Sequence, residues 1–362
     1  MTPNIARADM NDAYREIIAA GADERLNLFL TAATRMGTPV QNVEKDFWVC
    51  WVLDALFHGT GDVGPRLLFK GGTSLSKAFG LIPRFSEDID ITVFRSDLGH
   101  DASVEELEAL SGKRRRARLD AIRGACQTFI AGPLYERLSA VGEALPGLDT
   151  GRGRFELDPQ DPDRQTLLFW YPAVTDTSDY VRSAVKIEAG AKSAVDPNVP
   201  ATVTPYVVED LPDMPLGIDG ITTVKAERTF WDKVIILHGT RRWFERRGTL
   251  RHGGHRVSRH YYDIFRLLQS PAGVEFVTDL GLARDCARHA RMFFNSPDFD
   301  LDAAVAGRLV PAPTPDMLDA LRRDYQAMSG MIFGPIPPFE EVMTAVHRLE
   351  AGIAAALGDL QV

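Results

Sequence analysis

Hydrophobic residues in the first sixty positions recur with the period of an α-helix. The residues that share the first helical face are Met10, Ala13, Tyr14, Ile17 and Ile18. A second apolar stretch covers residues 43–57, and Asn42 stands where it would cap that helix. The pattern predicts a helical N-terminal segment that packs on the rest of the chain.

The middle of the chain alternates turn-rich breaks with short apolar runs. Glycine and proline at 59–65 predict a turn, and period-two alternation after Gly147 predicts strands. In order, the predicted elements are strand 67–70, helix 73–79, strand 89–94, one or two helices over 105–145, and strands 154–158, 165–171 and 181–188.

Helical spacing returns at Val224 and dominates to the C-terminus. The fold class predicted from this layout is α+β, a mixed β-sheet core flanked by helices with a helical C-terminal domain. The expected boundaries are a helical segment at 1–62, the sheet core at 63–223 and the helical domain at 224–362.

Two aspartates interrupt the strand that contains Ile89 and Ile91. Alternation places Asp88 and Asp90 on one face of the sheet and the isoleucines on the other. Aspartate is disfavoured in strands, and two carboxylates on one face repel each other unless a cation lies between them. A solvated edge strand is the alternative. Hard oxygen ligands otherwise favour Mg²⁺, with Mn²⁺ also acceptable, in a site directed at phosphates.

A glycine pair, Gly71 and Gly72, lies between the predicted strand and the next helix. Glycine lets the backbone approach a ligand, and the first N–H groups of a helix favour anions, so Thr73 and Ser74 would face a phosphate. Steric demands of a tight strand-to-helix turn are the alternative. The spacing is not that of a Walker A loop.

A third carboxylate often completes a two-metal site. Glu188, near the end of a predicted strand, is the strongest candidate, and Asp196 in the following loop is a weaker one. The alternative for Glu188 is an exposed side chain paired with Lys186 or Lys192.

Composition restricts the class of protein. The 362 residues carry a formal net charge of −9, which argues against polyanion binding over the whole surface. Cysteine spacing indicates no metal site or disulfide framework. The N-terminus lacks the apolar core of a signal peptide, and no apolar run approaches a membrane span. We expect a cytoplasmic protein with no membrane partner.

Two basic stretches stand out within this acidic chain. Residues 241–259 interleave arginine with Trp243 and Phe244, which would suit RNA, although a solvated loop is an equal alternative. Residues 113–118 are better explained as an exposed helix face than as an RNA contact. His252 and His255 have no partner at zinc spacing.

Five segments, in this order, resemble the AbiEii/AbiGii toxin family of the nucleotidyltransferase fold. They are VEKDFW at 43–48, KGGTSLSKAF at 70–79, RFSEDID at 84–90, AERTFWDK at 226–233 and RHYYD at 259–263. The resemblance runs from about residue 43 to 268 and is weak beyond. Members of this family are toxins of type IV-like toxin–antitoxin and phage-defence systems.

The resemblance implies a role for each matching residue. Asp88 and Asp90 would hold Mg²⁺, and Arg84 and Ser86 would line the nucleotide pocket together with Ser74. Lys233 and Asp263 would be the other residues needed for activity.

Physically, Lys233 would neutralise a triphosphate, and Asp263 would hold Lys233 or accept a proton. The alternatives are a lysine that extends to solvent from an apolar helix, and a surface pairing of Asp263 with His260 and Arg259 at the start of a helix.

The resemblance also implies the reaction. An NTP would donate NMP to an acceptor hydroxyl, at the 3′ end of tRNA, and a cognate antitoxin would exist. A protein-modifying NMP or phosphate transferase and a non-catalytic nucleotide-binding module remain the alternatives.

Overall fold

The computed structural model describes residues 10–61, 64–146, 153–175 and 183–358, and contains two compact units. The first, here the sheet unit, comprises Met1–Phe79, Phe85–Ala102 and Gly112–Val224. The second, here the helical unit, comprises Gly80–Arg84, Ser103–Ser111 and Lys225–Val362.

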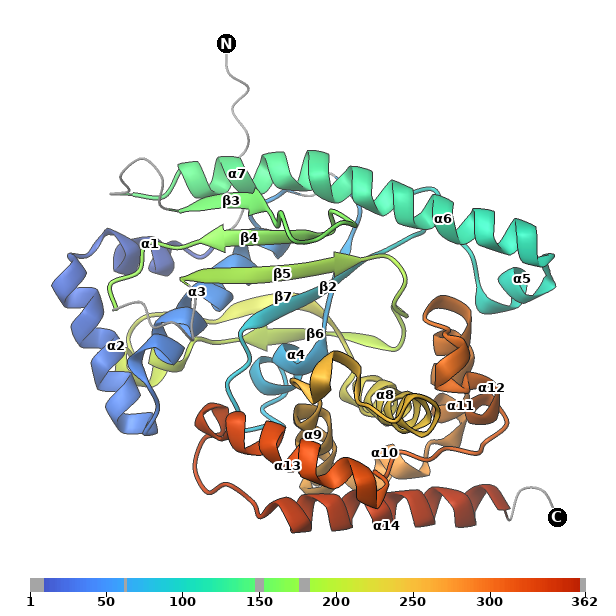
Figure 1. The fold of residues 1–362 in the computed structure, drawn as a ribbon. Helices are drawn as coiled ribbons and strands as arrows, with labels where there is room; N and C mark the ends of the chain where they lie inside the picture. The colour runs from blue at the N-terminus through green and yellow to red at the C-terminus, as the bar shows by residue number, and fades with distance from the viewer. Residues whose placement is uncertain (1–9, 62–63, 147–152, 176–182, 359–362) are drawn as a thin grey trace. The chain divides into compact units, whose positions relative to one another are not determined.

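One mixed sheet of seven strands forms the centre of the sheet unit (Figure 1). Its spatial order is β3-β4-β5-β2-β1-β7-β6. The β2–β5 and β1–β7 pairs are parallel and the other neighbours are antiparallel, which confirms the predicted mixed sheet. The strands are β1 (Leu67–Lys70), β2 (Asp88–Val93), β3 (Arg154–Leu157), β4 (Thr166–Trp170), β5 (Ala184–Gly190), β6 (Asn198–Val203) and β7 (Ile218–Val224).

Two of these strands, β6 and β7, have no counterpart among the predicted elements. Pro200 lies within β6 and Gly220 within β7, and both residue types weaken a strand signal. Val181 and Arg182, at the start of the predicted strand 181–188, lie outside the described residues.

The apolar face of the sheet packs against helix α3 (Val40–Phe57), which is buried from Asn42 to Leu56. Trp51 contacts the rings of Phe155 and Phe169, at centroid distances of 6.4 and 4.8 Å. Helix α3 begins after Pro39, so the predicted cap at Asn42 is wrong. Asn42 lies inside the first turn, and its side-chain amide donates to Thr38 Oγ1 at 3.0 Å.

Three buried charged residues near the start of α3 all have partners. Glu44 accepts hydrogen bonds from the backbone of Val174 and Thr175. Lys45 pairs with Glu87 at 2.8 Å, and Asp46 pairs with Lys77 at 2.7 Å. These pairs attach α4 (Gly71–Lys77) and the residue before β2 to the core.

The remaining helices of the sheet unit flank the sheet. Helices α1 (Asp12–Ala19) and α2 (Ala22–Met36) precede α3. In Figure 1, α6 (Gly112–Phe129) and α7 (Tyr135–Glu143) run as one long rod beside β3, joined by a π-helical turn at Ile130–Leu134.

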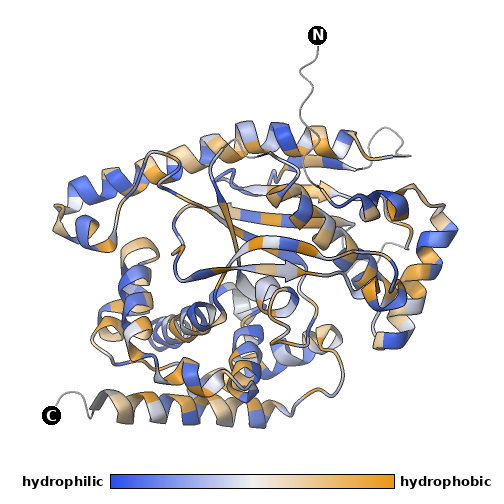
Figure 2. Cartoon of the chain, turned by 180° about the vertical axis from the view of Figure 1, so that it is seen from behind, coloured by the Kyte–Doolittle hydropathy of each residue, from blue (hydrophilic) through white to orange (hydrophobic). Residues whose placement is uncertain are grey.

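The helical unit begins its main part with α8 (Ala226–Arg247), which confirms the predicted helical C-terminal region. Helix α14 (Phe339–Gly358) has buried residues at 342, 346, 349 and 353, three or four positions apart, and carries hydrophobic and hydrophilic residues together (Figure 2). The other helices are α5 (Val104–Ala109), α9 (Ser258–Gln269), α10 (Gly273–Thr278), α11 (Leu280–Phe293), α12 (Leu301–Val305) and α13 (Leu318–Ala327).

Candidate active site

The predicted aspartate pair lies on β2, the central strand of the seven-stranded sheet. Ile89 and Ile91 are fully buried, whereas Asp88 and Asp90 are half-buried on the opposite face. The register places Asp88 beside Lys186 and Asp90 beside Glu188 on β5. On the other side, Lys70 at the end of β1 lies opposite Asp90. The strand is internal, so the alternative of an edge strand is excluded.

Gly71 lies so close to Asp90 that there is no room for a side chain at position 71. Its φ of 82° lies in the left-handed region, and a β-carbon at this position would overlap Asp90 Oδ2 and lie 2.9 Å from Asp90 Cγ. Glycine is therefore required here by the backbone and by the neighbouring carboxylate together. Gly72 follows in the first turn of α4. Nothing in the sequence pattern indicated that the glycine makes room for an aspartate.

The hydroxyl groups after the glycine pair already have protein partners. Thr73 Oγ1 lies 2.7 Å from Ser86 Oγ and also donates to the Asp88 carbonyl oxygen. Ser74 Oγ donates to the Gly71 carbonyl oxygen at 2.9 Å. Thr73 and Ser74 are buried. The Thr73 bonds hold α4 against the start of β2, and the assignment of Thr73, Ser74 and Ser86 to phosphate binding stays a prediction.

Glu188 lies on the same face as the aspartates, but its nearest partner is a lysine. Its Oε1 contacts Lys186 Nζ, and its side chain is 46% exposed. Asp196 lies in the turn before β6, where Asn198 donates to it at 3.1 Å. Among the residues that the structure describes, no group of three or more His, Cys, Asp or Glu side chains could hold a metal ion. The aspartate pair is thus the carboxylate set on which a metal assignment rests.

The helical unit contains a buried ion cluster centred on Asp263. Arg84 donates to it through Nε at 2.7 Å and Nη2 at 2.8 Å, in a two-point pair. Lys233 Nζ lies 2.8 Å from the second carboxylate oxygen. Asp263 is fully buried, and Arg84 and Lys233 are 3% and 5% exposed. Both alternatives, a lysine extended to solvent and a surface pair, are therefore excluded.

Electrostatics give Asp263 a holding role. Burial alone would raise the pKa of this carboxyl, but Arg84 and Lys233 lower its pKa well below the usual range. Burial and the nearby Arg84 lower the pKa of Lys233, while Asp263 opposes that shift. The pKa of His260 is also lowered, by burial and by Lys233 and Arg259. Asp263 is thus a poor proton acceptor that holds the Arg84 and Lys233 side chains in place.

The pairing of Arg84 with Asp263 could not be foreseen from the sequence. Residues 80–84 belong to the helical unit although they lie between α4 and β2 in the chain. Arg84 forms an isolated bridge with Ile332, and the Pro83 carbonyl oxygen accepts from Phe333 N at 2.9 Å. Two residues later, Ser86 belongs to the sheet unit.

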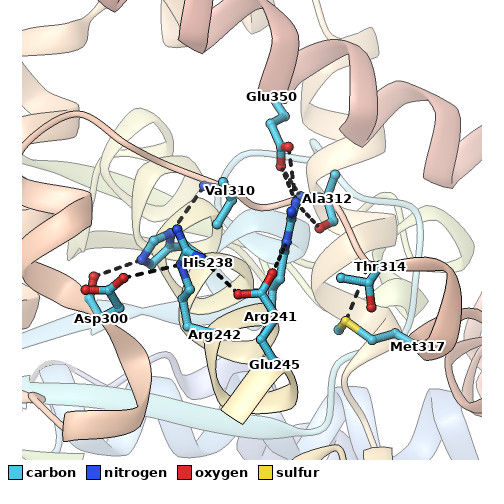
Figure 3. Close-up of polar contacts among 10 residues, drawn as sticks. All are labelled: His238, Arg241, Arg242, Glu245, Asp300, Val310, Ala312, Thr314, Met317 and Glu350. Atoms are coloured by element: carbon cyan, nitrogen blue, oxygen red, sulfur yellow. Dashed lines mark hydrogen bonds and ion pairs between the residues drawn. The ribbon is translucent and has the colours of Figure 1, made fainter. Parts of the chain in front are cut away.

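The first arginines of the basic stretch at 241–259 form ion pairs with carboxylates of the helical unit (Figure 3). Arg241 pairs with Glu245 and Glu350, and Arg242 pairs with Glu245 and Asp300. These arginines belong to α8, so this part of the stretch is helix rather than loop.

The aromatic and histidine side chains nearby are also engaged. The ring of Trp243 contacts the guanidinium groups of Arg247 and Arg251. The pKa of buried His238 is lowered by burial, and its Nδ1 accepts from Val310 N at 3.2 Å. These contacts indicate packing within the helical unit.

Comparison with known proteins identifies the family. The model for the family described as nucleotidyl transferase AbiEii toxin, type IV toxin–antitoxin system, matches residues 54–346, which is more than half of the chain. The chain belongs to the AbiEii toxin family. It is accordingly a nucleotidyltransferase, and the family implies an NTP substrate and a cognate antitoxin.

The AbiEii match starts after the predicted motif at 43–48 and extends well beyond residue 268. The chain is also similar to the solved structure of MenT4, a nucleotidyltransferase toxin from Mycobacterium tuberculosis H37Rv. The two are 14% identical, with a TM-score of 0.40 over 96% of this chain and 98% of that one. No curated protein matches the chain in sequence. Among the described residues, no helix is long and apolar enough to cross a membrane.

Proposed function

We propose that this AbiEii-family protein transfers NMP from an NTP to the 3′ end of tRNA in a Mg²⁺-dependent reaction. The observation that carries the proposal is the aspartate pair on β2, whose Asp90 carboxylate fills the space left by Gly71.

The donor set fits Mg²⁺. This ion keeps several waters and binds through one or two carboxylates plus substrate phosphates, so it needs no cage of protein ligands. Asp88 and Asp90 would hold it, and Glu188 would join only after leaving Lys186. When bound, the ion would neutralise charge on the phosphates and on the departing pyrophosphate.

The chain's own residues supply binding and orientation. The backbone at Gly71–Gly72 would lie along the triphosphate, because neither glycine has a side chain of its own. Lys233 would offer a positive charge to a phosphate, and Asp263 would fix its position. Because Asp263 accepts from two cations, we assign it no proton transfer.

Exposed basic residues at the start of α6 support an RNA acceptor. Lys113, Arg114 and Arg116 are exposed, whereas Arg241 and Arg242 are paired with carboxylates. Phosphate contacts by such side chains are independent of sequence and weaken with salt. We therefore assign RNA contact to residues 113–116 in preference to 241–259.

Incubation of the purified protein with each labelled NTP, total tRNA and a protein lysate tests the proposal. Label in tRNA that an exonuclease removes from the 3′ end is the expected result. Label in protein would support the protein-modifying alternative, and tight NTP binding without label would support a non-catalytic module. Omission of Mg²⁺, with and without Mn²⁺ added back, tests the metal requirement.

A further inference from the structure

Two lysines lie beside the aspartate pair on the same face of the sheet. Lys70 on β1 is opposite Asp90, and its Nζ lies 3.8 Å from Asp90 Oδ1. Lys186 on β5 is beside Asp88, and its Nζ contacts Glu188 Oε1. The face therefore carries two ammonium groups among three carboxylates.

The two lysines differ in the closeness of their partners. The ammonium of Lys186 has a short contact to Glu188 on its own strand. That of Lys70 is farther from its carboxylate than a hydrogen bond allows, and its side chain is 27% exposed. Such a loose, half-exposed pair is worth little in stability, so Lys70 can exchange one anionic partner for another at little cost.

The position of Lys70 also links the two parts of the proposed site. It directly precedes Gly71, whose lack of a side chain leaves room for the Asp90 carboxylate. An ammonium and a divalent cation that share Asp90 repel each other. A triphosphate over the glycine pair would offer the ammonium a second anionic partner.

We propose that Lys70 competes with the metal ion for Asp90 in the nucleotide-free protein and transfers to the triphosphate when the nucleotide binds. Metal alone is then held weakly, and metal with NTP is held tightly. This inference rests on the proposed function, because it takes Asp88 and Asp90 as the metal ligands.

Binding of Mn²⁺ alone to the full-length, nucleotide-free protein, followed by electron paramagnetic resonance, tests the first half. We expect Lys70→Met to raise the affinity for Mn²⁺ about fivefold and Lys70→Arg to stay near wild type. Arg15→Met removes one positive charge from an exposed position on α1 and should leave the affinity for Mn²⁺ unchanged. Asp90→Asn should abolish the gain in the Lys70→Met background.

NTP binding in the presence of Mg²⁺, measured calorimetrically, tests the second half. Lys70→Met should weaken the binding of the preferred NTP by about fivefold or more. Equal Mn²⁺ affinity of Lys70→Met and wild type, including no binding by either, would overturn the competition. Unchanged NTP affinity would overturn the transfer to the phosphates. Neither result depends on turnover, so a failure of the proposed transfer reaction would be seen separately, as wild-type protein that labels no acceptor.

Discussion

The candidate clusters of the two units hold their carboxylates in opposite ways. Asp90 on β2 has 29% of its side chain exposed and a loose contact with Lys70. Asp263 is fully buried, and Arg84 and Lys233 together engage both of its oxygens. A half-exposed carboxylate can accept a new ligand, whereas a saturated one can only position its partners. We therefore assign ligand binding to the first cluster and orientation of cations to the second.

Stability should respond most strongly to a change at Asp263. Asp263→Ala leaves Arg84 and Lys233 buried without their counter-charge, which should cost about 3–5 kcal/mol in the free energy of unfolding. Asp88→Ala, at a half-buried position, should cost under about 1 kcal/mol. Urea denaturation measures both.

A double variant sharpens the same prediction. Adding Lys233→Met to Asp263→Ala removes one unpaired cation, so the double variant should lose less than the sum of the single losses. Equal stability of Asp263→Ala and Asp88→Ala would show that the buried cluster does not hold the helical unit together.

A smaller effect on stability is expected at Gly71. Gly71→Ala places a β-carbon at a left-handed φ and against Asp90, so it should cost about 1–3 kcal/mol and displace the carboxylate. Gly99 has a similar φ of 74°, but a β-carbon there would meet no described atom within 4 Å, so Gly99→Ala should show the backbone strain alone. Nucleotide transfer should be lost in the first variant and kept in the second. Nucleotide transfer by Gly71→Ala at the wild-type rate would show that the active site does not require a glycine at this position.

The pH dependence of stability separates the clusters again. Because the pKa of Asp263 is lowered on folding, its contribution is present above its unfolded pKa of about 3.9 and is lost as the pH falls toward the folded value. Between about pH 5 and the acid transition, the free energy of unfolding of the wild-type protein should therefore fall more than that of Asp263→Asn. Chemical denaturation at several pH values across that range measures both. If the free energies of unfolding of the two proteins changed with pH in parallel, the partners of Asp263 would not lower its pKa on folding.

Stability should respond least to a change at the start of α6. Arg114→Glu at an exposed position should change the free energy of unfolding by less than about 0.5 kcal/mol. It should weaken tRNA binding severalfold and lower the salt dependence of that binding. Arg247→Glu, at a residue already paired with Asp298, is the matched control. A larger loss of tRNA affinity in Arg247→Glu than in Arg114→Glu would show that residues 241–259 contact the RNA instead.

Local periodicity predicted much of the fold and the placement of the aspartate pair on its strand. Alternation placed Asp88 and Asp90 on the face opposite Ile89 and Ile91, and the structure has that arrangement. Strands β6 and β7 were missed, since Pro200 and Gly220 weaken the strand signal and only pairing within the sheet offsets them.

The partners of the charged residues depend on contacts between distant parts of the chain. Arg84 and Asp263 lie 179 positions apart, and no periodicity joins them. The family motifs identified both residues without indicating that they pair. Similarly, the contact that excludes a side chain at Gly71 comes from Asp90, on the next strand of the sheet.

We expect the Asp90 carboxylate to be required for nucleotide transfer but its charge not to be required for folding. Transfer of labelled NMP to tRNA by Asp90→Asn, with thermal unfolding measured on the same sample, tests both expectations at once. We predict that transfer falls at least about a hundredfold while the unfolding midpoint stays within about 2 °C of wild type. Transfer at the wild-type rate by the folded variant would show that the Asp90 carboxylate is not part of the reaction.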